Sequence, residues 1–384
     1  MKRALLFLAV FVVVASAVYA LVIIPNFSAF KTLYANNDGM RDGYEYIEST
    51  YSLKALTEFL GDHPAYISIV SFNVNNPDSG IFYEPNTPRT LGTLSNFFLI
   101  TEYERQVSEG ILNPEEVISD FTQIERFSLP DISEESHKKS VAILGVEDEN
   151  HITLDQLVTV MAQTNDLAIS DYLWFKLGEG NLKALMDSLS LESTDMPLPF
   201  SGLYLSIHPD ITDTSNSVSE TEVIALAEQI YKDDTFAAST KALFGKVRLN
   251  LSFIEERDAL EHFPHTTALE MARLMAKLYK NELLSPEISR KVKEKMGWVF
   301  QGESIKRSFA EYGALYDNRM GMLSGIDFGT SMYDEHTSAQ AVFFDKLPVA
   351  FWLHLSANHM QEDYQQRLIW DPALFETTIK EINN

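Results

Sequence analysis

Residues 266–287, TTALEMARLMAKLYKNELLSPE, carry the most specific pattern in the chain. Their spacing predicts one helix over 266–279 that begins at the two threonines. Pro286 stands where a proline suits the first turn of a second helix, which is expected to run to Met296. Upstream, the same spacing predicts helices over 52–60, 93–110, 151–161 (with Thr153 as N-cap), 166–177 and 181–188.

Both ends of this helical block are flanked by predicted strands. Residues 65–74, AYISIVSFNV, alternate and are rich in β-branched and aromatic side chains, and a turn over 76–80 leads back into a strand over 81–83. After about residue 305, strands are expected over 310–316, 337–344 and 349–355, and a last helix over 372–382. This order predicts a two-lobed α/β fold of the α+β type, with an antiparallel sheet built from both chain ends and a large helical insert.

The N-terminus has the pattern of an export signal. Met1-Lys2-Arg3 precedes 21 residues without charge, 4–24. They form either a signal peptide cleaved after 15–17 or 18–20, or an uncleaved anchor long enough to span a bilayer. We therefore expect a periplasmic or extracellular domain, held at the membrane if the segment is uncleaved. The polar residues 25–46 are expected to form a tether.

Composition excludes several function classes. The 384 residues include 30 Lys+Arg and 55 Asp+Glu, and a net charge of -25 argues against nucleic acid as a partner. The absence of Cys excludes disulfides, thiol catalysis and cysteine-based metal sites, and the 9 His are scattered. We expect neither a metal nor another cofactor.

The order of elements and the stretch 266–287 resemble the superfamily of class A β-lactamases and penicillin-binding proteins, which are serine hydrolases. The resemblance covers about residues 47–384. Within it, 47–92 and 305–384 would form the sheet lobe and 93–304 the helical lobe. Residues 99–110, LITEYERQVSEG, resemble the helix that carries the nucleophile, and 153–178 resemble the region of the second motif. The resemblance implies three active-site motifs, S-x-x-K, S-D-N and K-T-G, and a β-lactam or cell-wall peptide as ligand.

The first motif is altered in this chain. Counting back from Gly110 places the nucleophile position on Thr93 and the lysine position on Asn96. Thr93 keeps a hydroxyl, although a β-branched one, whereas the Asn96 amide cannot accept a proton. Ser95 is an alternative nucleophile, but Phe98 follows it where a lysine would be needed.

The second motif falls on Thr164-Asn165-Asp166. Thr164 keeps the hydroxyl, and Asp166 places a carboxylate where the family has an amide. These residues also fit a plain helix N-cap. The family's Glu-x-x-Leu-Asn loop is missing from 189–217, although Glu192 is present.

The third motif has two candidate positions. Leu323-Ser324-Gly325 keeps the hydroxyl and the glycine but lacks the cation, and we favour it on spacing. Arg319-Met320-Gly321 keeps a cation and a glycine but lacks the hydroxyl. On a strand, residues 319, 321 and 323 face the same way, so Arg319 would supply positive charge from a displaced position.

These substitutions favour a degenerate member of the family. The aligned pocket loses two lysine cations and gains Asp166, which disfavours an anionic ligand. The sequence thus predicts an exported pseudoenzyme that binds or scaffolds near the cell envelope, with peptidoglycan or a β-lactam-like molecule as a candidate ligand. The alternative is an active hydrolase that uses Thr93 or Ser95, and a third option is an unrelated activity elsewhere on the fold.

Overall fold

The computed structural model describes residues 36–146, 151–212, 218–297, 314–317, 323–331 and 335–383. The predicted export segment, 4–24, lies outside this part. Within the described ranges, no helix is both long and apolar enough to cross a bilayer.

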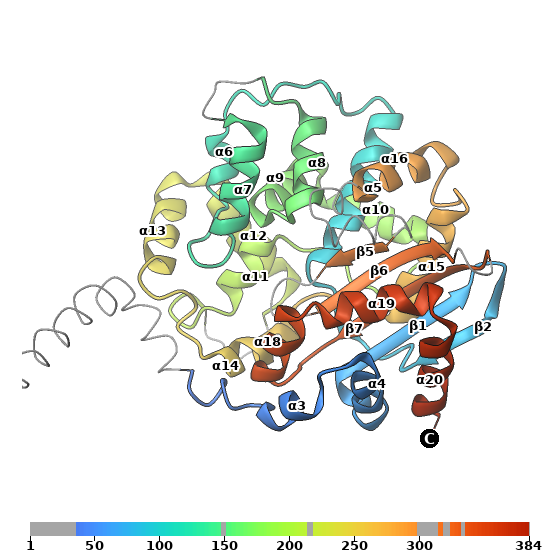
Figure 1. The fold of residues 1–384 in the computed structure, drawn as a ribbon. Helices are drawn as coiled ribbons and strands as arrows, with labels where there is room; N and C mark the ends of the chain where they lie inside the picture. Colours follow the sequence, from blue (N-terminus) through green and yellow to red (C-terminus); the bar gives the residue numbers. More distant parts are fainter. Residues whose placement is uncertain are drawn as a thin grey trace, which may run out of the picture.

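A five-stranded antiparallel sheet forms the centre of the molecule, and its strands come from both ends of the chain (Figure 1). Its order is β2-β1-β7-β6-β5, and the strands span β1 Ile67–Asn73, β2 Asn76–Tyr83, β5 Ala314–Asp317, β6 Leu323–Thr330 and β7 Thr337–Phe344. The central pair joins distant segments, since Ile67 lies opposite Phe344 and Asn73 opposite Ser338. A second, two-stranded sheet pairs β3 (Arg89–Thr90) with β4 (His265–Thr266). The predicted α+β architecture is confirmed.

One face of the sheet is covered by the helical block. Its members are η3 Gly92–Leu94, α5 Ser95–Ser108, α6 Thr122–Glu125, α7 Glu134–Leu144, α8 Leu154–Thr164, α9 Leu167–Leu177, α10 Glu179–Leu189, α11 Phe200–Ser206, α12 Glu220–Lys232, α13 Asp234–Phe244, α14 Phe253–Ala259, η5 Leu260–His262, α15 Ala268–Tyr279 and α16 Pro286–Gly297. The largest core cluster joins Phe97 and Phe98 of α5 to Ala339, Ala341 and Phe343 of β7. Burial of this apolar surface holds the helices on the sheet.

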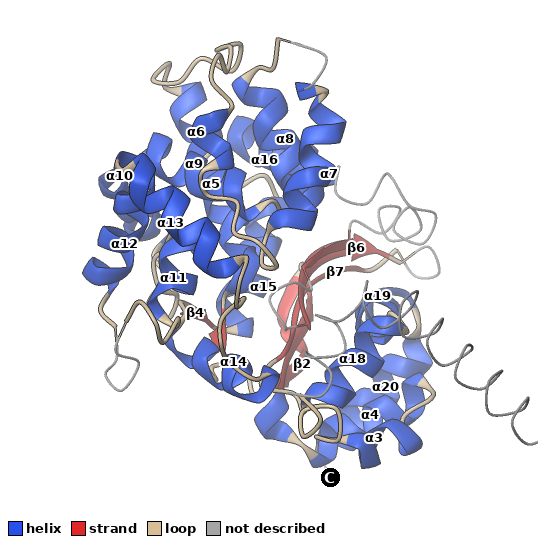
Figure 2. Ribbon diagram, turned by 90° about the vertical axis from the view of Figure 1, so that its left-hand side faces the viewer, coloured by secondary structure: helices blue, strands red, loops and turns tan. Residues whose placement is uncertain are grey.

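The opposite face is covered by helices from the two chain ends (Figure 2). They are α3 Tyr44–Ser49, α4 Leu53–Asp62, η2 Pro64–Tyr66, α18 Val349–Ala357, α19 Met360–Trp370 and α20 Pro372–Ile382. Val342 and Phe344 point to this side, whereas their neighbours Ala341 and Phe343 point to the other. This alternation places β7 between two apolar layers.

Most predicted helices are present, and side-chain caps explain where they begin. Ser52 caps α4, and Thr267 caps α15 by accepting from Glu270 N. Thr153 and Gln156 form a reciprocal capping box at α8, as the sequence predicts for Thr153. The strands 65–74 and 337–344 are confirmed as β1 and β7.

Two local predictions are wrong. Residues 349–355 form helix α18 and not a strand, because a short apolar run has no period that separates strand from buried helix, and Phe351 and Leu355 are buried one helical turn apart. Residues 76–80 are predicted to form a turn, but they belong to β2. The turn between β1 and β2 is shorter and lies at Val74-Asn75. Pro77 is accommodated because β2 is an edge strand with a bulge. Of the predicted strand 310–316, residues 314–316 are in β5, and 310–313 lie outside the described residues.

The described part of the predicted tether is packed against the domain. Asn36 Oδ1 accepts a hydrogen bond of 2.6 Å from Phe253 N. Asp42 Oδ2 accepts bonds from Arg257 at 2.8 Å and from Val349 N at 3.1 Å. Residues 36–42 therefore join α14 to α18 and do not form a free linker.

A buried carboxylic acid lies between the sheet and α19. Asp327 is fully buried, and its Oδ2 accepts a bond of 2.9 Å from Gln340 Nε2, which is also 2.5 Å from Gln365 O. Ser71 Oγ donates to Gln340 Oε1 at 3.0 Å, whereas Asp327 Oδ1 has no partner among the described residues. Burial raises the pKa of Asp327 well above its usual value, since the charged form loses its hydration.

The Asp327→Asn variant is expected to gain stability relative to wild type as the pH rises from about 4 to neutrality. A raised folded-state pKa means that Asp327 destabilises the fold as pH rises above about 4, the ordinary value, while the amide is neutral throughout. Urea unfolding at about pH 4 and near neutrality would measure this, with the exposed Asp187→Asn as control. Equal effects of Asp327→Asn at both pH values would contradict the prediction.

Candidate functional site

The first motif lies where the chain enters helix α5. Thr93 is in η3 and Ser95 is the first residue of α5, so both hydroxyls are at the start of a helix, as the resemblance implies. Both residues and Asn96 are nonetheless buried, with Thr93 only 2% exposed. The Thr93 hydroxyl has no hydrogen-bond partner within the described chain. A substrate carbonyl could reach it only if the surrounding side chains moved.

Asn96 links α5 to α9. Its Oδ1 accepts a bond of 2.8 Å from Ser170 Oγ, and its Nδ2 lies 3.5 Å from Asn165 Oδ1. Ser170 Oγ is also 2.8 Å from Asp166 O, so its single proton is shared between two acceptors. The side chain at the lysine position thus holds two helices together, and as a neutral amide it cannot take a proton from Thr93.

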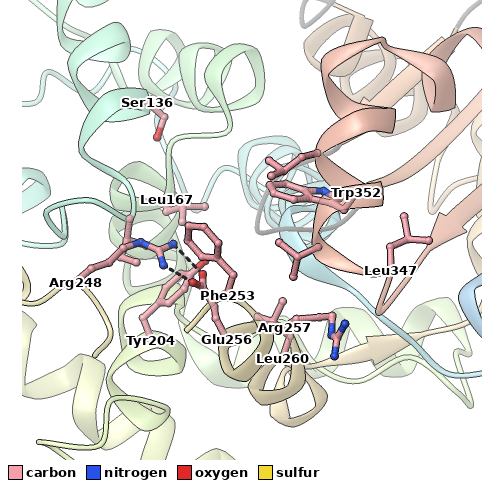
Figure 3. Close-up of a pocket in the computed structure, with 13 residues that line it drawn as sticks. Ser136, Leu167, Tyr204, Arg248, Phe253, Glu256, Arg257, Leu260, Leu347 and Trp352 are labelled. Carbon is pink, nitrogen blue, oxygen red and sulfur yellow. Dashed lines mark hydrogen bonds and ion pairs between the residues drawn. The ribbon is translucent and has the colours of Figure 1, made fainter. Parts of the chain in front are cut away.

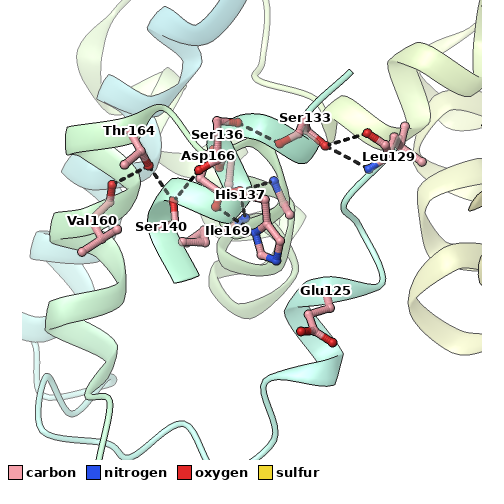
Figure 4. A network of polar contacts seen from close by, with 12 residues as sticks. Glu125, Leu129, Ser133, Ser136, His137, Ser140, Val160, Thr164, Asp166 and Ile169 are labelled. Carbon is pink, nitrogen blue, oxygen red and sulfur yellow. Dashed lines mark hydrogen bonds and ion pairs between the residues drawn. The ribbon is translucent and has the colours of Figure 1, made fainter. Parts of the chain in front are cut away.

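The second motif forms the junction between α8 and α9 (Figure 4). Asn165 adopts the left-handed conformation, with φ of 49°, and this turns the chain between the two helices. Thr164 Oγ1 lies 2.8 Å from Ser140 Oγ and donates to Val160 O at 2.8 Å, so it faces α7. The contact between Asn165 and Asn96 joins the second motif to the first. The Thr164 hydroxyl instead bonds to Ser140 and Val160.

Asp166 is the N-cap of α9 and also orients a histidine. Its Oδ1 accepts from Ala168 N at 2.8 Å and Ile169 N at 3.1 Å, and its Oδ2 lies 2.8 Å from His137 Nδ1. The N-cap interpretation of the sequence is therefore confirmed. The N-terminus of α9 offsets part of the negative charge that the sequence places in the pocket. His137 Nε2 is buried and unpartnered among the described residues.

A second buried aspartate on α9 supports the neighbouring helix. Asp171 accepts bonds from Phe200 N at 2.6 Å and Ser201 N at 2.7 Å, the first N–H groups of α11. Burial raises the pKa of Asp171 to about 7, and the nearby charge of Asp166 adds to the rise. Neither His137 nor Asp171 was identified from the sequence, because their partners are 29 residues or more away.

The favoured third motif lies on an inner strand. Leu323-Ser324-Gly325 begins β6, where Ser324 pairs in register with Asp317 of β5 and Phe343 of β7. Ser324 shares a strand face with Ile326, which belongs to the core on the helical side of the sheet. The Ser324 side chain therefore lies on the face of the sheet that is covered by the helical block, which includes α5. The alternative, Arg319-Met320-Gly321, lies outside the described residues.

The segment after α10 contains Glu192 but no Glu-x-x-Leu-Asn pattern. Glu192 is exposed, and its backbone N–H donates to Glu270 Oε1 at 2.8 Å. Helices α11 to α14 follow over the described parts of 200–259. No group of three metal-ligating side chains that could hold an ion occurs in the described ranges.

A cavity of about 350 Å³ opens between these helices and α18 (Figure 3). Leu167, Tyr204 and Phe253 line it from the helical block, and Leu347 and Trp352 line it from the opposite side. One of its lining residues, Leu167, directly follows the second motif in the sequence.

Comparison with known proteins shows the fold but not the chemistry. No family model matches the sequence, and no curated protein matches it significantly. Among solved structures, a β-lactamase from Sphaerobacter thermophilus superposes with a TM-score of 0.51 and 13% identity over 83% of this chain and 99% of that protein. A variant of a reconstructed ancestral class A β-lactamase of Gram-negative bacteria superposes with a TM-score of 0.49 and 13% sequence identity. The match covers 81% of this chain and 99% of that protein. The first of these likenesses establishes a β-lactamase-like fold.

Proposed function

We propose that this chain, whose fold is that of the β-lactamases, has lost serine-hydrolase chemistry and acts as an exported binding or scaffolding protein at the cell envelope. One observation carries the proposal: the Thr93 hydroxyl is buried without a hydrogen-bond partner among the described residues, and Asn96, at the lysine position, accepts a hydrogen bond from Ser170. A hydroxyl becomes a nucleophile when a base removes its proton. No such base contacts Thr93 among the described residues.

We expect the rate of acylation to be far lower than in an enzyme that keeps the lysine of the S-x-x-K motif. A positioned general base contributes about 10²–10⁴-fold to such a reaction, and the Asn96 amide contributes none of this. Ser95 does not replace Thr93, because it is equally buried and the residue three positions later is Phe98. The export part of the proposal is supported by the 21 uncharged residues behind Lys2 and Arg3.

We expect the purified full-length protein to form no covalent adduct with a fluorescent penicillin and to leave a chromogenic cephalosporin intact. Opening of the β-lactam ring releases no leaving group, so acylation would raise the intact mass by the whole mass of the penicillin. Intact-mass spectrometry after overnight incubation measures this, and a cooperative thermal melt of the same sample shows that the protein is folded.

An adduct on Thr93 or Ser95 would refute the proposal and support the alternative, an active hydrolase. Thr93→Ala provides the control for that outcome, because it removes the hydroxyl and little else. The double variant Thr93→Ser, Asn96→Lys tests the motif positions independently. If it gained acylation, Thr93 and Asn96 would be the correct equivalents of the family's serine and lysine.

A further inference from the structure

The cavity between α14 and α18 has mainly apolar walls. Leu167 and Phe253 line one side of it, and Leu347 and Trp352 line the other (Figure 3). Leu260 and Val349 add further apolar lining. Tyr204 is almost completely buried beneath the same space. An apolar space of about 350 Å³ is too large for its walls to contact each other. Water inside it would find few polar partners, whereas an apolar ligand would regain the missing van der Waals contacts.

The charges at the cavity are already paired with each other. Arg248 forms a two-pronged ion pair with Glu256, with one contact at 2.8 Å (Figure 3). Arg257 pairs with Asp42 at 2.8 Å and with Asp258. A charged ligand would have to break one of these pairs or remain uncompensated in an apolar space, and both alternatives are unfavourable. The ligand that fits is therefore uncharged.

We infer that this cavity binds an uncharged, mainly apolar small molecule. The inference rests on the binding role proposed above and names its ligand class. Because the walls belong to both lobes, the bound molecule would contact α9 and α14 on one side and α18 on the other. Ligand sites commonly form at such junctions, from apolar walls with a few polar groups.

Benzophenone is a suitable probe, because it is an apolar, uncharged ketone and inserts into nearby C–H bonds when illuminated. We expect saturable labelling of the full-length protein, with the labelled residues in α14 and α18 as mapped by peptide mass spectrometry. Val349→Phe fills the space and should lower this labelling at least about ten-fold. Val117→Phe, a matched change at an exposed site outside the cavity, should leave it unchanged.

Leu353→Phe fills the same space from a second lining position on α18 and should also lower the labelling about ten-fold. This variant also keeps the proposal testable if Val349→Phe does not fold. Labelling that does not saturate, or that neither cavity variant reduces, would overturn the inference. Failure of this inference can be told apart from failure of the proposed function. The inference is tested by benzophenone labelling at the cavity, whereas the proposed function is tested by a penicillin adduct on Thr93 or Ser95.

Discussion

Replacing Arg89 by lysine is expected to lower the free energy of unfolding by about 3 kcal/mol. Arg89 is 3% exposed, and its guanidinium donates to Ser68 Oγ at 2.9 Å, Ala65 O at 2.6 Å and Ile67 O at 2.6 Å. A further bond of 3.1 Å reaches Pro64 O. The planar fork of arginine reaches all four oxygens, whereas an ammonium group cannot, so lysine would leave buried carbonyl groups without donors.

The position of Arg89 makes this loss relevant to the candidate site. Arg89 belongs to β3 and lies three residues before Gly92, where η3 begins and leads into α5. Urea unfolding followed by circular dichroism would measure the loss. Arg290→Lys on α16, where the side chain is 54% exposed, should cost no more than about 0.5 kcal/mol. Similar losses in the two variants would show that the Arg89 hydrogen bonds add nothing.

The second large effect is expected from Asp171→Ala, at about 3 kcal/mol of destabilisation. The change removes the acceptor of two buried N–H groups, Phe200 N and Ser201 N, and leaves both unsatisfied. Asp171→Asn keeps one acceptor oxygen and should therefore lose less. Hydrogen exchange at Phe200 and Ser201 should accelerate in the alanine variant, since their N–H groups lose their buried acceptor on α9.

Asp233→Ala is the matched control for Asp171→Ala. Asp233 also accepts from two backbone N–H groups, Thr235 N at 2.8 Å and Phe236 N at 3.1 Å, but it is exposed. Water can replace its carboxylate, so the expected loss is about 1 kcal/mol, as for an ordinary N-cap. If Asp171→Ala cost no more than Asp233→Ala, burial would not be the source of the effect.

The sequence predicts the architecture well because the periodic segments agree with their environment. The helix over 266–279 has one apolar face and becomes α15, and the alternating 65–74 becomes β1. Residues 349–355 are misassigned because α18 is apolar on nearly every side, so no period is visible. The helical spacing of apolar residues therefore predicts α15, whereas α18 has no such spacing and could not be predicted as a helix.

The candidate site was predictable only in part. Counting from the helix end places Thr93 at the start of α5 and Asp166 at an N-cap, and the structure has both. The partners of Asp166 and Asn96 could not be inferred, because His137 reaches Asp166 and Ser170 reaches Asn96 through tertiary contacts that leave no local pattern. The cavity was missed for the same reason: its walls come from 132–136, 167, 204, 248–260 and 347–353.

The pairing of β1 with β7 has a consequence for how the protein reaches its native state. Val70 and Ala341 are paired neighbours in the sheet, yet most of the chain separates them. During synthesis, one edge of β1 lacks its hydrogen-bonding partner until β7 has been made. Such non-local pairing slows folding and prolongs exposure of an aggregation-prone edge. We therefore expect a slow, late-closing folding reaction in which the sheet is completed last.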